Sequence, residues 1–170
     1  RNDDPEKYMN GFPWHPHRGI ETITYVLRGN VEHSDSLGNK GVLSDGDVQW
    51  MTAGSGIIHQ EMPSGNASGQ MHGFQLWANL PRDQKMCTPR YQDIKSADIN
   101  ALTDDDGTHI RVIAGDYRGY RGLVDGIDTD PSYLDIRLLP NVKKRFPFDT
   151  RRQGFAYVFE GSAHFGNAST

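Results

Sequence analysis

The sequence predicts an all-β fold, a sandwich or small barrel built from many short strands. Runs of β-branched and aromatic residues recur about every 8–12 residues, and turn-forming residues separate them. The 170 residues include 19 glycines, 9 prolines and 10% aromatic residues, which favours strands and turns over long helices. With 35% hydrophobic residues, the chain can form one complete core, or one domain and part of a second.

The clearest strand covers residues 20–27, which read IETITYVL and are followed by the turn sequence Arg-Gly-Asn. Residues 81–106 are charged and irregular, with a short helical turn expected at 96–102, and residues 118–130 read as a glycine-rich loop. Further strands are expected wherever similar apolar runs are bounded by turn residues, at 31–35, 42–43, 47–51, 57–62, 71–80, 109–114, 133–138 and 155–159.

One short pattern, a strand followed by a charged residue and a glycine, occurs twice, at residues 24–29 (TYVLRG) and 155–161 (FAYVFEG). The repetition predicts that one β-domain is duplicated in the chain. Histidines precede only the first copy, because the residues before the second read TRRQ. The chain starts without methionine and stops soon after the second copy, so we expect a fragment whose second domain is incomplete.

Composition and charge exclude several classes of protein. The net charge of −4 argues against direct nucleic-acid binding, which requires a basic surface. No run approaches the roughly 18 consecutive apolar residues of a membrane span, so we expect no membrane interaction. The single cysteine, Cys87, rules out a disulfide within the chain and favours a reducing compartment, the cytoplasm.

Two pairs of side chains at alternate positions predict a metal site. His15 and His17 flank a proline just before the clearest strand, and residues two apart in an extended chain point to the same side. His59 and Glu61 repeat this spacing. Imidazoles and a carboxylate converging from two strands suit iron, manganese, nickel, copper or zinc. Without a partner inside a barrel these polar groups would be costly, which favours metal binding over simple packing.

The same alternation places other residues relative to the first histidine pair. Glu21 shares its parity, and could be a further ligand, a group that supports a ligand, or a salt-bridge partner. The apolar residues of this parity should continue the histidine face, and they are Ile23, Tyr25 and Leu27. Isolated histidines are interpreted as ordinary surface or core residues, and these are His33, His109 and His164. The parity of His72 relative to the ligands is not fixed.

At these residues the sequence resembles the cupin superfamily and, within it, the pirin family. The first cupin motif, His-x-His followed by a carboxylate and a glycine, is matched by HPHRGIETITYVLRG at residues 15–29. The second, a glycine-rich turn before a histidine, is matched by GDVQWMTAGSGIIHQEMP at residues 46–63. The pirin-like segments are FPWHPHRGIET, QWMTAGSGIIHQEMP and GFQLWANLP. The resemblance is strong over residues 11–81 and weaker beyond them.

The resemblance implies a bicupin, two jelly-roll barrels of double-stranded β-helix type with a metal in the N-terminal one. We therefore expect a metal-binding barrel at residues 1–82, connecting strands at 83–130, and the start of a metal-free barrel at 131–170. The implied ligands are His15, His17, His59 and Glu61, with Glu21 outside the coordination shell. The implied metal is Fe(II), one per chain, although manganese, nickel, copper or zinc fit the same ligands.

The resemblance also implies quercetin 2,3-dioxygenase activity, in which a flavonol reacts with dioxygen, its heterocycle opens and carbon monoxide leaves. Glu61 would be the catalytic base that takes the proton of the flavonol 3-hydroxyl. The alternative is a non-enzymatic, iron-binding redox sensor, a nuclear transcriptional co-regulator with a protein partner. The acidic charge and the shortness of the basic run at 143–145 weigh against that alternative. A metal-dependent isomerase or small-molecule binder is a third interpretation, since cupin folds host many functions.

An aromatic substrate needs an apolar pocket, and five large side chains are available for its walls: Tyr25, Trp50, Met51, Phe74 and Trp77. Each is expected to belong to the core rather than to the pocket wall. Trp50 and Met51 point to opposite faces of their strand, so at most one of them lines the site.

Overall fold

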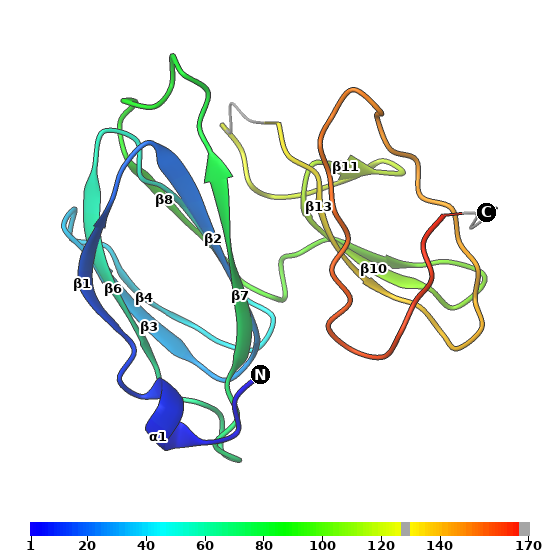
Figure 1. Cartoon of the computed structure of the whole chain (residues 1–170), viewed down its shortest axis with the longest axis horizontal. Coiled ribbons are helices and arrows are strands. Elements are labelled where there is room, and N and C mark those ends of the chain that lie inside the picture. The colour runs from blue at the N-terminus through cyan, green and yellow to red at the C-terminus, as the bar shows by residue number, and fades with distance from the viewer. Residues whose placement is uncertain (127–129, 167–170) are drawn as a thin grey trace. The chain divides into compact units, whose positions relative to one another are not determined.

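The computed structural model describes residues 1–126 and 130–166 (Figure 1). Within them the chain is almost entirely β-structure, as predicted, and the only α-helix is the single turn α1 (Pro5–Tyr8). No helix in these residues is long and apolar enough to cross a membrane. Contacts divide the chain into two units, Arg1–Leu139 and Pro140–Thr170.

One four-stranded antiparallel sheet of the first unit carries both predicted ligand segments. Its strand order is β1-β6-β3-β4, so β1 is an edge strand with β6 beside it. Pro16 is compatible with β1 because an edge strand does not donate every backbone N–H to a neighbour. The strands of this sheet are β1 (Phe12–His17), β6 (Ile57–Pro63), β3 (Val31–Asp35) and β4 (Lys40–Leu43).

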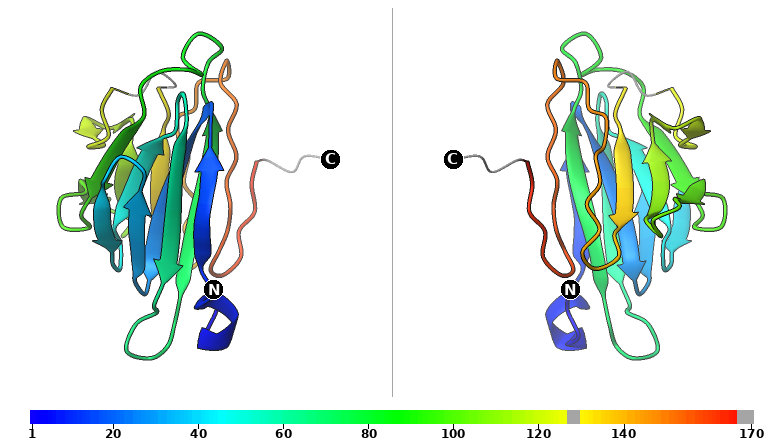
Figure 2. Two further views of the ribbon diagram at one scale, coloured as in Figure 1. Left: turned by 90° about the vertical axis from the view of Figure 1, so that its left-hand side faces the viewer. Right: turned by 90° about the vertical axis from the view of Figure 1, so that its right-hand side faces the viewer.

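A second antiparallel sheet packs face to face against the first (Figures 1 and 2). Side-chain hydrogen bonds cross between the sheets, from Thr24 to Glu61 at 2.8 Å and between Gln49 and His33 at 2.9 Å. In order across the sheet, its strands are β7 (His72–Asn79), β2 (Ile20–Arg28), β5 (Val48–Thr52) and β8 (Arg90–Ile94).

The rest of the first unit forms a smaller sheet and a hairpin. The three-stranded sheet has the order β13 (Tyr133–Arg137), β10 (His109–Ala114), β9 (Ala101–Thr103). The hairpin joins β11 (Asp116–Tyr117) to β12 (Tyr120–Arg121), where only a loop was expected. Its two connecting residues both have positive φ, as a type I′ turn requires, and Gly119 follows Arg118 there.

The largest core cluster lies between β2, β5 and the three-stranded sheet. Ile23, Tyr25 and Trp50 are fully buried in it and pack with Ile113 of β10, and Leu27 packs against its margin. The expectation that Ile23, Tyr25 and Leu27 continue the histidine face is therefore wrong. Alternation holds only within one strand, and β1 and β2 belong to different sheets.

The change of sheet takes place at Gly19, whose φ of +69° is one that side-chain-bearing residues rarely adopt. After this turn, Thr24 points to the inside of the sheet pair, where it reaches Glu61. Glu21 lies on the other side of β2, buried, and accepts a hydrogen bond from Thr52 at 2.8 Å. Glu21 is thus separated from the two histidines whose parity it shares.

The second unit, Pro140–Thr170, is described over residues 140–166, and those residues contain no strand or helix. The strand expected at 155–159 is not formed, although its alternating aromatic pattern is typical of one. Phe155 and Tyr157 are 79% and 69% exposed. A strand requires ladder pairing with a neighbouring strand, and 155–159 is not a member of any sheet in the described residues, so local preference alone does not make it a strand.

A buried polar contact ties the second sheet to the three-stranded sheet. The hydroxyl of Tyr25 donates a hydrogen bond to Asp135 at 2.6 Å and accepts one from Arg111 at 2.8 Å. Burial and the neighbouring Asp135 carboxylate raise the pKa of Tyr25, so the hydroxyl keeps its proton. Because Asp135 is itself 5% exposed, it depends on this hydroxyl to offset the loss of water.

Replacing Tyr25 by Phe should lower the free energy of unfolding by about 1–3 kcal/mol, because the Asp135 carboxylate would lose its donor. Urea denaturation with metal removed measures the change. Tyr120→Phe, at an exposed tyrosine of β12, is the matched control and should have little effect. Equal stability of Tyr25→Phe and wild type would show that the contact contributes nothing to the fold.

Candidate metal centre

Three of the predicted ligands come together in the space between the two four-stranded sheets. One ring nitrogen from each of His15, His17 and His59 lies within 4.8 Å of the other two. His15 and His17 alternate along β1, and the pairing of β1 with β6 places His15 directly opposite His59. The Nε2 atoms of His15 and His59 are 3.0 Å apart. Among the described residues, this is the only such cluster of metal-binding side chains.

The environment keeps two of these imidazoles neutral. His59 is completely buried, and burial together with its histidine neighbours lowers its pKa to about 3. Burial, and then the proximity of His15, lowers the pKa of His17. A neutral ring offers a nitrogen lone pair, so both residues remain competent to bind a cation at pH values where a solvated histidine would be protonated.

Two further observations fit a metal ion. His17 Nε2 is buried and has no hydrogen-bond partner in the described residues. Such atoms are costly unless something else satisfies them. In an octahedral site with metal–nitrogen distances of about 2.1 Å, neighbouring ligand atoms are about 3.0 Å apart. The observed separation of the His15 and His59 nitrogens, 3.0 Å, equals that spacing.

The structure places Glu61 next to the histidine cluster but not within it. It follows His59 by two residues on β6 and is 3% exposed. Its carboxylate accepts hydrogen bonds from Thr24 at 2.8 Å and from Gln75 at 2.6 Å. A carboxylate can accept about four such bonds, so these two leave lone pairs for a cation. The role of Glu61 as the fourth ligand stays a prediction.

Contrary to the expectation that His33 stands apart from the metal site, its ring lies 5.3 Å from that of His59. It is fully buried, with Nδ1 2.9 Å from Gln49 and Nε2 3.5 Å from Asp35. Burial lowers the pKa of His33, and the nearby Asp35 opposes that shift. In the pairing of β3 with β6, His33 lies opposite Glu61 and Asp35 lies opposite His59. The signal in the sequence that could have pointed to this position is the two-residue spacing of His33 and Asp35, which places both side chains on one side of β3.

The other histidines lie outside the cluster. His72 packs its ring against Phe74 at 5.5 Å and stands opposite Arg28 in the register of β2 and β7. His109 belongs to β10 of the three-stranded sheet, where Nδ1 is 3.0 Å from the hydroxyl of Thr103. His164 belongs to the second unit.

Of the five aromatic or apolar pocket candidates, Trp77 is in ring contact with one of the three clustered histidines, whereas Phe74 contacts His72. Trp77 is 60% exposed, and its ring meets His17 edge-on at 5.1 Å. The expectation that Trp77 belongs to the core is therefore wrong. Tyr25 and Trp50 lie in the core, and Met51 is buried in a small cluster with Ile57.

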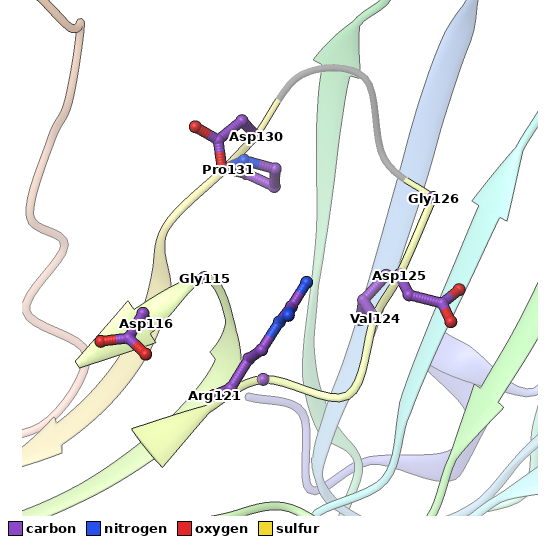
Figure 3. A pocket seen from close by; sticks show the side chains of 9 residues that line it. Gly115, Asp116, Arg121, Val124, Asp125, Gly126, Asp130 and Pro131 are labelled. Atoms are coloured by element: carbon purple, nitrogen blue, oxygen red, sulfur yellow. The ribbon is translucent and has the colours of Figure 1, made fainter. Parts of the chain in front are cut away.

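A separate hollow of about 310 Å³ lies beside the β11–β12 hairpin (Figure 3). The side chain of Arg121 extends into the hollow, and Asp116 and Asp130 line it beside this arginine. None of the three clustered histidines lines this hollow, so it is distinct from the metal centre.

The depressed pKa of His59 predicts a pH-dependent stability of the metal-free protein. Unfolded His59 binds a proton near its ordinary pKa of 6.5, whereas in the folded state it does so only near 3. The unfolded state therefore binds more protons between these values, and stability must fall as the pH falls below about 6.5. The expected loss from pH 7 to pH 5 is about 2 kcal/mol. Urea titrations with a chelator should show it, with a shallower slope in His59→Gln; identical slopes would contradict the assignment.

Comparisons with known proteins identify the family. A pirin family profile matches residues 1–78. A pirin-like protein of Arabidopsis thaliana is 48% identical over 160 residues, which cover 93% of this chain and 51% of that protein. A protein of Thermoplasma acidophilum, provisionally named a quercetin 2,3-dioxygenase, is 38% identical over 186 aligned residues, which cover 99% of this chain and 71% of that protein.

Solved structures agree. The crystal structure of a quercetin 2,3-dioxygenase from Acinetobacter baumannii matches with a TM-score of 0.61 at 44% identity, over 69% of this chain and 42% of that one. A protein from Geobacillus kaustophilus gives the same TM-score at 46% identity, over 68% and 45% of the two chains. The chain spans about half the length of several curated relatives that it matches, and 71% of the Thermoplasma acidophilum protein. Histidine motifs, fold and relatives thus lead to one conclusion: the chain belongs to the pirin family.

Proposed function

We propose that this chain carries the metal centre of a dioxygenase that opens the heterocycle of a flavonol such as quercetin and releases carbon monoxide. The observation that carries the proposal is the cluster of His15, His17 and His59, whose nitrogens converge within 4.8 Å between two sheets. The names of relatives from Thermoplasma acidophilum and Acinetobacter baumannii support the choice of reaction.

The donor set restricts the metal. Three imidazoles and the carboxylate of Glu61 would hold one divalent transition metal, and Fe(II) is the proposed ion, with manganese, nickel, copper and zinc as competitors. When bound, such an ion supplies Lewis acidity and, for iron, a redox centre that can activate substrate and dioxygen. Four protein ligands leave positions open on an octahedral ion, as a catalytic site requires.

Glu61 is the proposed base. A flavonol must lose the proton of its 3-hydroxyl, and in this step the O–H bond breaks, the proton passes to a Glu61 oxygen and the electron pair stays on the flavonol oxygen. Thr24 and Gln75 hold the carboxylate from the opposite sheet, which limits its motion. Both atoms of dioxygen then enter the product, and one carbon of the heterocycle leaves as carbon monoxide.

Trp77 is the proposed contact for the planar substrate. Its ring stands against His17 and is 60% exposed, so one apolar face is available beside the metal centre. An aromatic ligand that covers this face gains burial and ring stacking together.

Chain purified without added metal should contain close to one iron per chain and should bleach quercetin when air is admitted to an anaerobic sample. Elemental analysis and absorbance on the same sample measure the two quantities, and His59→Ala should lose both. Iron without bleaching would contradict the oxygenase and favour the redox-sensing regulator. Absence of metal would contradict the site itself.

Glu61→Gln, compared at full metal loading, should reduce kcat for quercetin at least about 100-fold, because the amide cannot accept the proton. Glu32→Gln is the matched control, at an exposed glutamate of β3, and should keep wild-type turnover. Unchanged turnover of Glu61→Gln at equal metal content would exclude Glu61 as the base.

A further inference from the structure

We propose that Gln75 and Trp77 are positioning residues that fix the orientation of the Glu61 carboxylate toward the metal centre. The inference rests on the proposed function, since it takes Glu61 to be a metal ligand. It concerns a strand that the histidine motifs do not include. Gln75 and Trp77 occupy alternate positions of β7, the edge strand of the second four-stranded sheet.

The two side chains form a hydrogen-bonded chain that ends on Glu61. The indole N–H of Trp77 donates to Gln75 Oε1 at 2.8 Å. The amide N–H of Gln75 donates to Glu61 Oε2 at 2.6 Å, and Nε2 is also 3.2 Å from the hydroxyl of Thr24. Thr24 in turn donates to Glu61 Oε1 at 2.8 Å. Each oxygen of the carboxylate thus receives one donor from the opposite sheet.

The chain has a fixed direction. An indole N–H can only donate, and a carboxylate can only accept. Gln75 has one end of each kind, so only one orientation of its amide satisfies both neighbours. The other orientation would set two donors against each other at Trp77 and two acceptors against each other at Glu61. Trp77 therefore determines which end of Gln75 faces Glu61.

Trp77 also connects this chain to the histidines. Its ring meets His17 edge-on at 5.1 Å, while its nitrogen holds Gln75. The hydrogen bonds through Gln75 thus link the Glu61 carboxylate to the Trp77 ring, which in turn contacts the proposed ligand His17 on the other sheet. Residues that orient metal ligands in this manner commonly change metal affinity by 10- to 100-fold when they are replaced.

Neither residue is needed to fill the core. Gln75 is exposed and Trp77 is 60% exposed, so replacing them removes little buried apolar surface. A loss of metal affinity in their variants can therefore be separated from a loss of folding. Trp77→Phe is the sharpest change, because it keeps a ring beside His17 and removes only the N–H donor and part of the ring area.

The experiment is a cobalt(II) titration of the metal-free 170-residue chain, followed by visible absorption, which reports coordination geometry, and by calorimetry, which gives the Kd. Gln75→Leu and Trp77→Phe should each raise the Kd about 10-fold or more and alter the cobalt spectrum. Trp14→Phe is the matched control, at a tryptophan 55% exposed on β1, and should match wild type in both measurements. Thermal unfolding of the metal-free variants should stay a single cooperative transition, with its midpoint lowered in Gln75→Leu, where buried Glu61 loses a donor, and close to wild type in Trp77→Phe.

A double-mutant cycle tests whether Gln75 acts through Glu61. In a Glu61→Ala background, the further change Gln75→Leu should have no added effect on the cobalt Kd, because no carboxylate remains to be oriented. An equal effect in both backgrounds would overturn the inference. So would wild-type affinity and spectrum in Gln75→Leu and Trp77→Phe, or wild-type affinity in Glu61→Ala.

The quercetin assay on the wild-type chain separates this inference from the proposed function. Cobalt affinity that depends on Gln75 through Glu61, in a chain whose iron form does not bleach quercetin, would support the positioning role and contradict the oxygenase. Quercetin bleaching by a chain whose cobalt affinity does not depend on Gln75 and Trp77 would support the oxygenase and contradict the positioning role.

Discussion

Antiparallel pairing of β1 with β6 sets His15 directly across from His59, and the metal centre depends on that one register. A shift by one residue would turn His15 and His17 to the outer face, since side chains alternate along a strand. β1 has a neighbour on one side only, so β6 alone fixes its register within the sheet. β6 is fixed in turn by β3, through the pairs His33–Glu61 and Asp35–His59.

The packing of two sheets against each other supplies the chemistry that the residues alone lack. Solvated histidines would be partly protonated at neutral pH, whereas burial holds the pKa of His59 near 3. The same burial makes an unsatisfied polar atom costly, which is why the unpartnered Nε2 of His17 favours a bound cation. Polar support comes from the second sheet, where Thr24 and Gln75 reach the carboxylate of Glu61.

The spacing of the histidines was sufficient to predict that His15 and His17 share one side of β1, and that His59 and Glu61 share one side of β6, because alternation within a strand is local geometry. What sequence alone could not supply is which strands are neighbours. His33 and Trp77 reach the site through the register of β3 with β6 and through the packing of β7, both of which are long-range contacts. The prediction that Tyr25 shares the face of the histidines was wrong because alternation was counted from β1 into β2, and these strands belong to different sheets.

That change of sheet at Gly19 divides one continuous motif between two strands of different sheets. The side-chain directions of His15 and His17 are set by β1 and those from Ile20 onward by β2, and a two-residue turn with a glycine at φ +69° lies between the strands. A residue inserted between His17 and Ile20 would keep the side-chain alternation within each strand and strain only the turn. The same insertion between His15 and His17 would turn one imidazole away from the other. The first histidine motif, although continuous in sequence, should thus tolerate a change in length only at its turn.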